Sequence, residues 1–136
     1  MIGKIVQGAD FRGVVNYVLQ KPDAEPLGGR GLRNDSIDHI VDSFRMQASL
    51  NPIAKPVAHI SLDFSVQDKE RLTNRMMMQI ADEYLRRMGY GNTQVLIVRH
   101  NDREHPHLHL VLNRIDGNGK RITDRNERIR NVKVCR

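Results

Sequence analysis

The chain has 136 residues, of which 39% are hydrophobic and 28% are charged. This length fits a single domain over residues 1–136 and excludes a second one, and the composition is typical of a globular protein, not of a disordered one. No apolar run approaches the roughly 20 residues that a membrane helix needs, so no membrane insertion is expected. The N-terminus carries no secretory signal pattern and the single cysteine, Cys135, cannot form an internal disulfide, so the expected location is the cytoplasm.

The net charge of +6 is concentrated toward the C-terminus. Residues 1–98 hold 12 Lys and Arg against 11 Asp and Glu, whereas residues 99–136 hold 10 against 5. Five of the six excess positive charges therefore lie in the last 38 residues. A basic segment of this kind is typical of proteins that bind phosphate-rich partners, although many such segments are only solvated surface.

In the first part of the chain, the pattern of apolar, capping and turn-forming residues predicts two helices after a short strand. In chain order we expect a strand over Met1–Gln7, a helix over Phe11–Gln20, an irregular connection over Lys21–Asp35 and a helix over Ser36–Leu50. Asp10 can cap the first helix. The connection is expected to be irregular because it is rich in Pro and Gly.

The remaining elements are a long helix and several strands. Alternation of apolar and polar residues predicts a strand over Val57–Phe64, and a capping box at Ser65 begins a helix that extends to Met88. Further strands are expected over Gln94–His100, His107–Arg114 and Lys120–Thr123. This order predicts an α+β fold in which the helices pack on one face of a largely antiparallel sheet of about five strands.

Four of the six histidines fall within ten residues. His107 and His109 share one face of a strand because side chains alternate with period two. If the two flanking strands pair as a hairpin, His100 lies opposite His107, so the three imidazoles can converge on one point. A lone histidine on a strand is usually a satisfied core or surface residue. Three convergent imidazoles with open positions left over are instead typical of a catalytic metal site.

Other polar residues near this cluster have more than one interpretation. A metal-bound imidazole normally donates its second N–H to a carboxylate, a carbonyl or water, and Asp102 and Asp63 are the candidate carboxylates. His59 shares the polar face of its strand with Asp63 and can line the site, orient a ligand or be solvated. His105 and His39 are interpreted as ordinary polar residues.

The sequence from Arg99 to Arg114 resembles the three-histidine motif of relaxases, the mobilization nucleases within the HUH endonuclease superfamily. Three further blocks, Met1–Ile5, Phe11–Leu19 and Pro56–Leu62, resemble blocks of the VirD2-like group in the same order. The resemblance extends to about Asp124. Ordered blocks of this kind are far more specific than an isolated His-x-His pair.

The resemblance implies that Tyr17 is the nucleophile, that His100, His107 and His109 hold a metal ion, and that Asn113 supports the motif. At 100° per residue, Tyr17 lies about 130° from the mean direction of the apolar residues of its helix, as a nucleophile facing solvent requires. For the proton acceptor, His59, Asp63 and metal-bound water are the alternatives. The metals associated with the family are magnesium and manganese, and nitrogen ligands favour manganese or another transition ion.

The implied reaction is strand- and site-specific nicking and rejoining of single-stranded DNA at an origin of transfer. It forms a 5′-phosphotyrosyl link and a free 3′-hydroxyl, in plasmid mobilization or conjugative transfer, with accessory mobilization proteins as further partners. Phosphate contacts are expected from four basic residues, namely Arg99, Arg114, Lys120 and Arg121.

Three competing functions have to be weighed. A relaxase-like DNA-binding protein without nicking activity would carry the same motifs. Initiators of rolling-circle replication usually place their tyrosine after the histidines, and a small-molecule metallohydrolase barrel needs about 250 residues. In relatives a helix usually follows the position of Thr123, whereas Asp124–Arg136 is short, basic and weakly patterned. We therefore expect either a compact variant or a C-terminally truncated relaxase.

Overall fold

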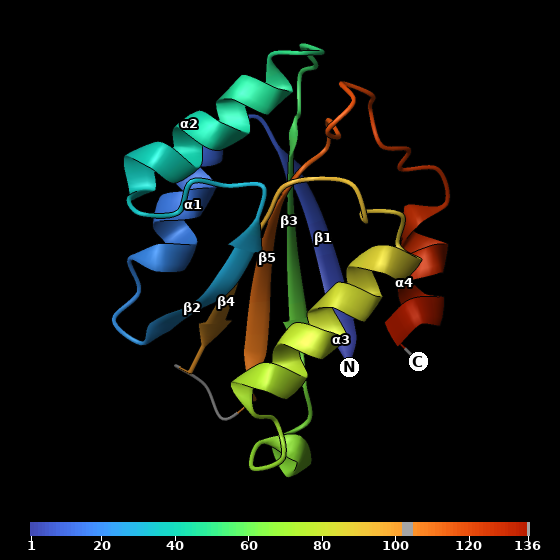
Figure 1. Cartoon of the computed structure of the whole chain (residues 1–136). Coiled ribbons are helices and arrows are strands. Elements are labelled where there is room, and N and C mark those ends of the chain that lie inside the picture. Colours follow the sequence, from blue (N-terminus) through green and yellow to red (C-terminus); the bar gives the residue numbers. More distant parts are fainter. Residues whose placement is uncertain (102–104, 136) are drawn as a thin grey trace.

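The structure is a computed structural model that describes residues 1–101 and 105–135. Within these residues the strands are β1 (Ile2–Gly8), β2 (Ala24–Arg30), β3 (Val57–Asp63), β4 (Val95–His100) and β5 (His107–Asn113). The helices are α1 (Phe11–Leu19), α2 (Ile37–Ala48), α3 (Asn74–Arg87) and α4 (Glu127–Cys135), with a short 3-10 turn η1 (Val66–Asp68). The strands form one sheet in the order β1-β3-β5-β4-β2, and all neighbours are antiparallel (Figure 1). The predicted α+β class and the antiparallel sheet are confirmed.

The helices cover both faces of the sheet, not one face as the sequence suggested (Figure 1). α1 and α2 pack on one face, against side chains such as Leu96 and Val111. α3 packs on the other face, against side chains such as Ile97 and Leu110. The physical reason is that β4 and β5 are apolar on both faces. An unbroken apolar run such as Val95–Val98 indicates a strand that is covered on both sides.

The connection that was expected to be irregular contains an edge strand. β2 pairs with β4, with a register shift between Pro26 and Gly28. Pro26 lacks the N–H that a central strand would need, and an edge strand tolerates that loss. Gly28 has φ of +155°, a conformation that side-chain-bearing residues rarely adopt, so glycine makes the irregularity possible. Conversely, the strand expected over Lys120–Thr123 is reduced to a bridge between Ile115 and Arg121.

Helix starts follow their capping residues. Asp10 accepts hydrogen bonds from the backbone N–H groups of Arg12 and Gly13, and Ser36 accepts one from His39, as the sequence predicts. The long helix starts later than expected. Ser65 caps only η1, whereas Thr73 accepts from the N–H of Met76 and begins α3.

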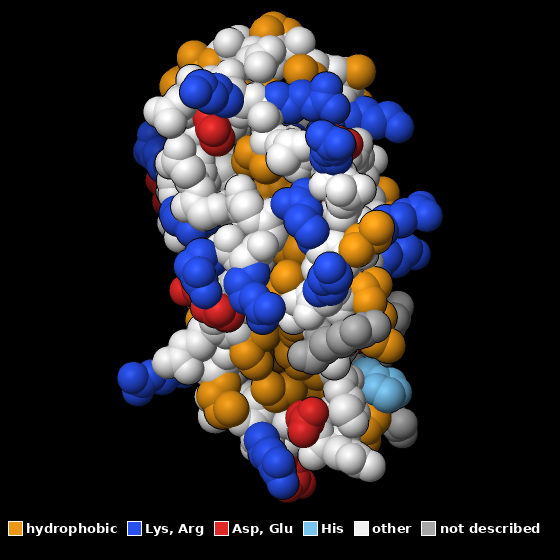
Figure 2. All heavy atoms as spheres, turned by 90° about the vertical axis from the view of Figure 1, so that its right-hand side faces the viewer, with side chains coloured by type: hydrophobic (Ala, Val, Ile, Leu, Met, Phe, Trp, Pro, Cys, Tyr) orange, Lys and Arg blue, Asp and Glu red, His pale blue; other side chains and the backbone are white. Residues whose placement is uncertain are grey.

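Polar anchors hold α4, a helix that the weak pattern of Asp124–Arg136 did not reveal. The Tyr84 hydroxyl donates to Asn131 Oδ1 (2.8 Å), and Asn131 Nδ2 donates to the Gly3 carbonyl (2.8 Å). The Tyr90 hydroxyl donates to Glu127. Figure 2 shows the side of the molecule that lies on the right in Figure 1, with Lys and Arg side chains above a patch of hydrophobic ones. Among the described residues, no helix is long and apolar enough to cross a membrane.

Candidate active site

α1 places Tyr17 beside the sheet. The helix buries Phe11, Val15 and Val18 against the sheet and α2, so that its apolar stripe fixes the rotation of the helix. Tyr17 lies off this stripe and is 49% exposed, as the helical spacing predicts.

The hairpin of β4 and β5 brings the three predicted histidines together. His100 is the register partner of His107, and His109 pairs with Val98, two residues further along the two strands. The three imidazoles are buried, and each offers one nitrogen such that these atoms all lie within 4.8 Å of one another. His109 Nε2 and His107 Nδ1 are only 3.1 Å apart. The convergence predicted from the strand spacing is therefore present.

The donor set fits a divalent transition ion. With metal–nitrogen distances of about 2.1 Å, two ligand nitrogens lie roughly 3–3.5 Å apart. The spacing of His107 Nδ1 and His109 Nε2 is already of this size. The Nε2 of His100 lies 2.8 Å from the Val18 carbonyl, which can only accept a hydrogen bond. Neutral His100 therefore carries its proton on Nε2 and its lone pair on Nδ1, the state that a metal ligand needs.

His59 is the hydrogen-bond partner of His109. Its Nε2 lies 2.8 Å from His109 Nδ1, and it belongs to β3, the strand that pairs with β5. A metal ion on His109 Nε2 would leave the proton of His109 on Nδ1, from which it would donate to His59. His59 thus occupies the place in which the sequence analysis expected a carboxylate.

Burial favours the neutral form of the His59 and His109 imidazoles. Loss of solvent, followed by the positive charge that His100, His59 and His107 carry when protonated, lowers the pKa of His109 to about 3. Burial and then the neighbouring His100 also lower the pKa of His59. Neutral imidazoles keep the lone pair that binds a metal, whereas protonated ones repel it.

Tyr17 reaches the same cluster from α1. Its ring centroid lies 6.0 Å from that of His59 and 6.1 Å from that of His109, both in edge-on orientation. The Lys21 Nζ atom lies 5.0 Å from the centre of the Tyr17 ring. An inner cavity of about 320 Å³ adjoins Tyr17 and the cluster, and its wall consists of Lys4, Val6, Tyr17, His59, Ser61, Asp63, His107 and His109.

Of the two predicted carboxylates, Asp63 lines the inner cavity and is the register partner of His107 on β3. Asp102 lies outside the described residues. The Val18 carbonyl and His59 supply the hydrogen bonds to the imidazoles that carboxylates were expected to make.

Asn113 lies at the opposite end of β5 from His107. Its side chain donates to the Phe44 carbonyl and to Gln94 Oε1, both at 3.0 Å, and accepts from the N–H of Ile115. These bonds tie the end of β5 to α2 and to the segment before β4. Asn113 therefore supports the hairpin that carries the histidines and does not contact them.

The four predicted phosphate-binding residues lie away from the inner cavity. Arg99 contacts the Leu72 carbonyl on the face that α3 covers. Arg114 is only 4% exposed and donates to the Lys55 carbonyl, so its guanidinium serves the fold. Lys120 and Arg121 are exposed in the turn beyond β5, at the end of the sheet opposite to His107.

Sequence reasoning missed the two lysines nearest to the site. Lys21 follows Tyr17 by one helical turn, a spacing that would have revealed it. Lys4 reaches the inner cavity because β1 pairs with β3 and places it opposite Ser61. That pairing joins segments far apart in the sequence, so no local pattern points to Lys4.

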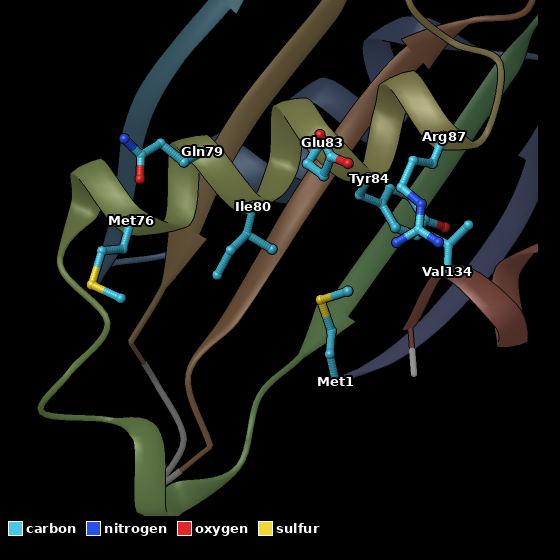
Figure 3. A pocket seen from close by; sticks show the side chains of 8 residues that line it. All are labelled: Met1, Met76, Gln79, Ile80, Glu83, Tyr84, Arg87 and Val134. Atoms are coloured by element: carbon cyan, nitrogen blue, oxygen red, sulfur yellow. The ribbon is translucent and has the colours of Figure 1, made fainter.

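A second cavity of about 330 Å³ lies on the other side of the molecule, between α3, α4 and the N-terminus (Figure 3). Met1, Ile80 and Val134 make it largely apolar, and Glu83 and Arg87 stand at its edge. Within the described part of the chain, no histidine lines it. The chemistry of the site therefore belongs to the inner cavity.

Comparison with known proteins agrees with this geometry. No curated protein matches the chain. The family described as relaxase, MobA/VirD2-like, nuclease domain, matches residues 17–136, which include Tyr17 and all three histidines of the cluster. Because this match covers most of the sequence, the chain belongs to the relaxase family, in its MobA/VirD2-like nuclease group.

Proposed function

We propose that this relaxase domain nicks single-stranded DNA at an origin of transfer, with the Tyr17 phenol as the nucleophile and His100, His107 and His109 as the metal ligands. Membership in the family supports a nicking function on DNA. The observation that carries the finer proposal is the contact of Tyr17 with His59 and His109 at one cavity. Tyr17 precedes the histidines in the chain, whereas replication initiators usually place their tyrosine after them.

The covalent step exchanges one phosphodiester for another. The Tyr17 oxygen attacks the phosphorus atom, the new O–P bond forms, and the bond from phosphorus to the 3′ oxygen breaks. The phenol proton passes to a base in the cavity, and the departing 3′ oxygen takes a proton and becomes a hydroxyl. Rejoining is the same exchange in reverse, so the phosphodiester energy is conserved in the tyrosyl link.

The histidine cluster would hold a divalent cation, with manganese favoured over magnesium because all three ligands are nitrogen. When bound, this ion would supply positive charge to the non-bridging oxygens of the phosphate and so favour in-line attack. His59 would keep the His109 ring in the ligating orientation through its hydrogen bond.

The carboxylate of Asp63 is the candidate side chain of the inner cavity for accepting the phenol proton, because the lone pair of His59 Nε2 already accepts the hydrogen bond from metal-bound His109. The roles of Asp63 and His59 separate experimentally. Replacement of Asp63 by Asn removes the base without touching the bond to His109, whereas His59→Ala removes that bond and leaves the base. Single-turnover cleavage rates of the two variants at saturating metal would identify the acceptor.

Lys4 and Lys21 would contact the phosphates that flank the attacked one. Lys4 lines the inner cavity, and Lys21 lies beside the Tyr17 ring. Each ammonium would contribute to affinity without reading sequence, and its contribution would fall as salt rises. The biological setting that we propose is plasmid mobilization or conjugative transfer, in which accessory mobilization proteins assist the relaxase.

The test is covalent capture. The protein is incubated with manganese and labelled single-stranded DNA from the origin of transfer of the element that encodes it. We expect an adduct that survives denaturation in the wild type and in Tyr84→Phe, which removes a buried tyrosine on the other face of the sheet. Tyr17→Phe should bind DNA and form no adduct. An adduct in Tyr17→Phe would refute the nucleophile, and binding without any nicking by the wild type would favour the non-cleaving alternative.

A further inference from the structure

The cavity between α3, α4 and the N-terminus adjoins a smaller one beside α4. The first measures about 330 Å³ and the second about 210 Å³, and Met1 lines both. Figure 3 shows Met76 and Arg87 at the two ends of the first cavity, with Met1 facing α3 between them. We call the two cavities together the α3–α4 groove.

Large apolar side chains are exposed along the α3–α4 groove. Met1 is 37% exposed, Met76 42%, Val132 54% and Ile2 72%, and all four line the groove. Apolar side chains that gather in this way, instead of lying singly, are typical of a surface that another molecule covers. Two of them are methionines, whose flexible side chains adapt to the shape of a partner.

The shape of the groove favours a helix as the occupant. The lining residues of α3 recur at spacings of three and four: Met76, Gln79, Ile80, Glu83, Tyr84 and Arg87. They form one stripe about 16 Å long, the length of three helical turns. A partner helix fills such a groove with side chains at the same spacings. An extended peptide would find no strand to pair with on α3 and α4, because a helix bonds its backbone groups internally.

The charges around the groove favour an acidic occupant. α3 carries three basic residues against two acidic ones, and α4 carries three against one. Glu83, the acidic residue of the wall, pairs with Arg86 at 2.6 Å. Within residues 1–101 and 105–135, no ion pair is formed by Arg87 or by three exposed cations of the same helices, Arg75, Arg128 and Lys133. A second copy of the chain would bring the same positive charge and be repelled.

We propose that the α3–α4 groove binds an acidic amphipathic helix of a partner protein. Apolar side chains of that helix would enter the two cavities, and its carboxylates would lie beside Arg87 and the neighbouring cations. The groove lies on the α3 side of the sheet, so an occupied groove leaves the inner cavity open. The inference does not depend on the proposed nicking.

The experiment compares two labelled helical peptides of about 18 residues, a length that spans the stripe. Both carry Leu at spacings of three and four, and their flanking positions are all Glu in one and all Lys in the other. Fluorescence anisotropy with the whole chain measures their affinities. We expect the Glu peptide to bind about tenfold more tightly, and Arg87→Glu to reduce that ratio several-fold. Arg33→Glu, before α2, changes the net charge equally and should leave the ratio intact.

Apolar contacts are tested in the same assay. Met76→Gln and Val132→Gln should each weaken binding of the Glu peptide about tenfold, because part of its apolar contact is lost. Met46→Gln is the matched control, since Met46 is 75% exposed on α2, on the other face of the sheet. Urea unfolding verifies that each variant is folded.

Several results would overturn the proposal. One is equal affinity for the two peptides, or binding of neither. Another is an equal loss in Met46→Gln and Met76→Gln, because the peptide would then lie elsewhere. Phosphatidylglycerol vesicles and sedimentation velocity of the protein alone test the other occupants. Vesicle binding or self-association that Met76→Gln abolishes, without a preference for the Glu peptide, would assign the groove to a membrane surface or to a second copy.

Discussion

His59 takes the place of the carboxylate or carbonyl that usually orients a metal-bound imidazole. Its Nε2 lies 2.8 Å from His109 Nδ1, and burial lowers the pKa of His59, so this partner is neutral. A neutral imidazole fixes the ring of His109 without adding negative charge to the site. The cluster therefore keeps a higher positive charge, once a cation binds, than the same cluster with a carboxylate partner.

Removal of the His59 ring should weaken metal binding. We expect His59→Ala to lower manganese affinity about 10- to 100-fold, because the His109 ring loses its orienting bond. His59→Gln should recover part of this loss, since the Gln amide can occupy the position of Nε2. Titration calorimetry on metal-free protein measures the affinities. His39→Gln, which alters an exposed histidine paired with Asp35, is the control. Equal affinities for wild type and His59→Ala would contradict this role.

At the scale of elements, α4 depends on one close approach to β1. A Cβ atom on Gly3 would lie 2.5 Å from Asn131 Oδ1, the atom that accepts the hydrogen bond from Tyr84. Asn131 is 8% exposed and also donates to the Gly3 carbonyl, so its side chain has little freedom to move. Glycine at this position is therefore a packing requirement of the helix that covers β1.

Replacement of Gly3 by Ala should destabilise the fold by about 1–3 kcal/mol, because the added methyl group displaces Asn131 and weakens its bonds. Gly8→Ala, on the same strand, is the matched control, since its Cβ would meet only Val57 Cβ at an ordinary 3.9 Å. Urea unfolding of both variants gives the free energies. The prediction fails if Gly3→Ala is no less stable than Gly8→Ala.

The histidine cluster could be predicted because its geometry is local. The period of two along β5 places His107 and His109 on one face, and a short hairpin brings His100 opposite His107. The position of Tyr17 off the apolar stripe follows in the same way from the helical period. Each of these inferences uses residues that are close in the sequence.

The elements that could not be predicted depend on distant contacts. β2 is held by Arg30, whose guanidinium donates to the carbonyls of Tyr90 and Thr93, and α4 by a bond that joins Asn131 to Gly3, 128 positions away. The bond from His59 to His109 likewise needs the pairing of β3 with β5. Nothing in the local patterns around these residues specifies such partners.

At the scale of the whole molecule, the two faces of the sheet carry different groups of residues. The face under α1 and α2 carries the histidines, and the face under α3 carries a larger apolar core with two buried tyrosines, Tyr84 and Tyr90. Burial raises the pKa of both phenols above their usual value, and the Glu127 carboxylate adds to the rise. Both phenols therefore stay protonated at a pH at which an exposed tyrosine begins to ionise.

Alkaline conditions should destabilise the whole fold. Above a pH of about 10, unfolded chains ionise both phenols while the folded protein does not, so the unfolded state binds fewer protons. The free energy of unfolding should then fall by up to about 1.4 kcal/mol per pH unit for each phenol. Urea unfolding between about pH 8 and 11, an interval that brackets the ordinary pKa of a tyrosine phenol, measures the slope. Tyr84→Phe should make the fall shallower, and a slope equal to that of the wild type would refute the explanation.

The bond from His100 to the Val18 carbonyl links the two halves of the site mechanically. The acceptor belongs to the residue directly after Tyr17, so a single peptide unit separates the proposed nucleophile from the residue whose carbonyl holds an imidazole. Tension on a DNA strand attached to Tyr17 would pass through that peptide unit to the His100 ring. In the nicking reaction that we propose, loading of the nucleic acid and alignment of the histidine ligands would therefore be coupled.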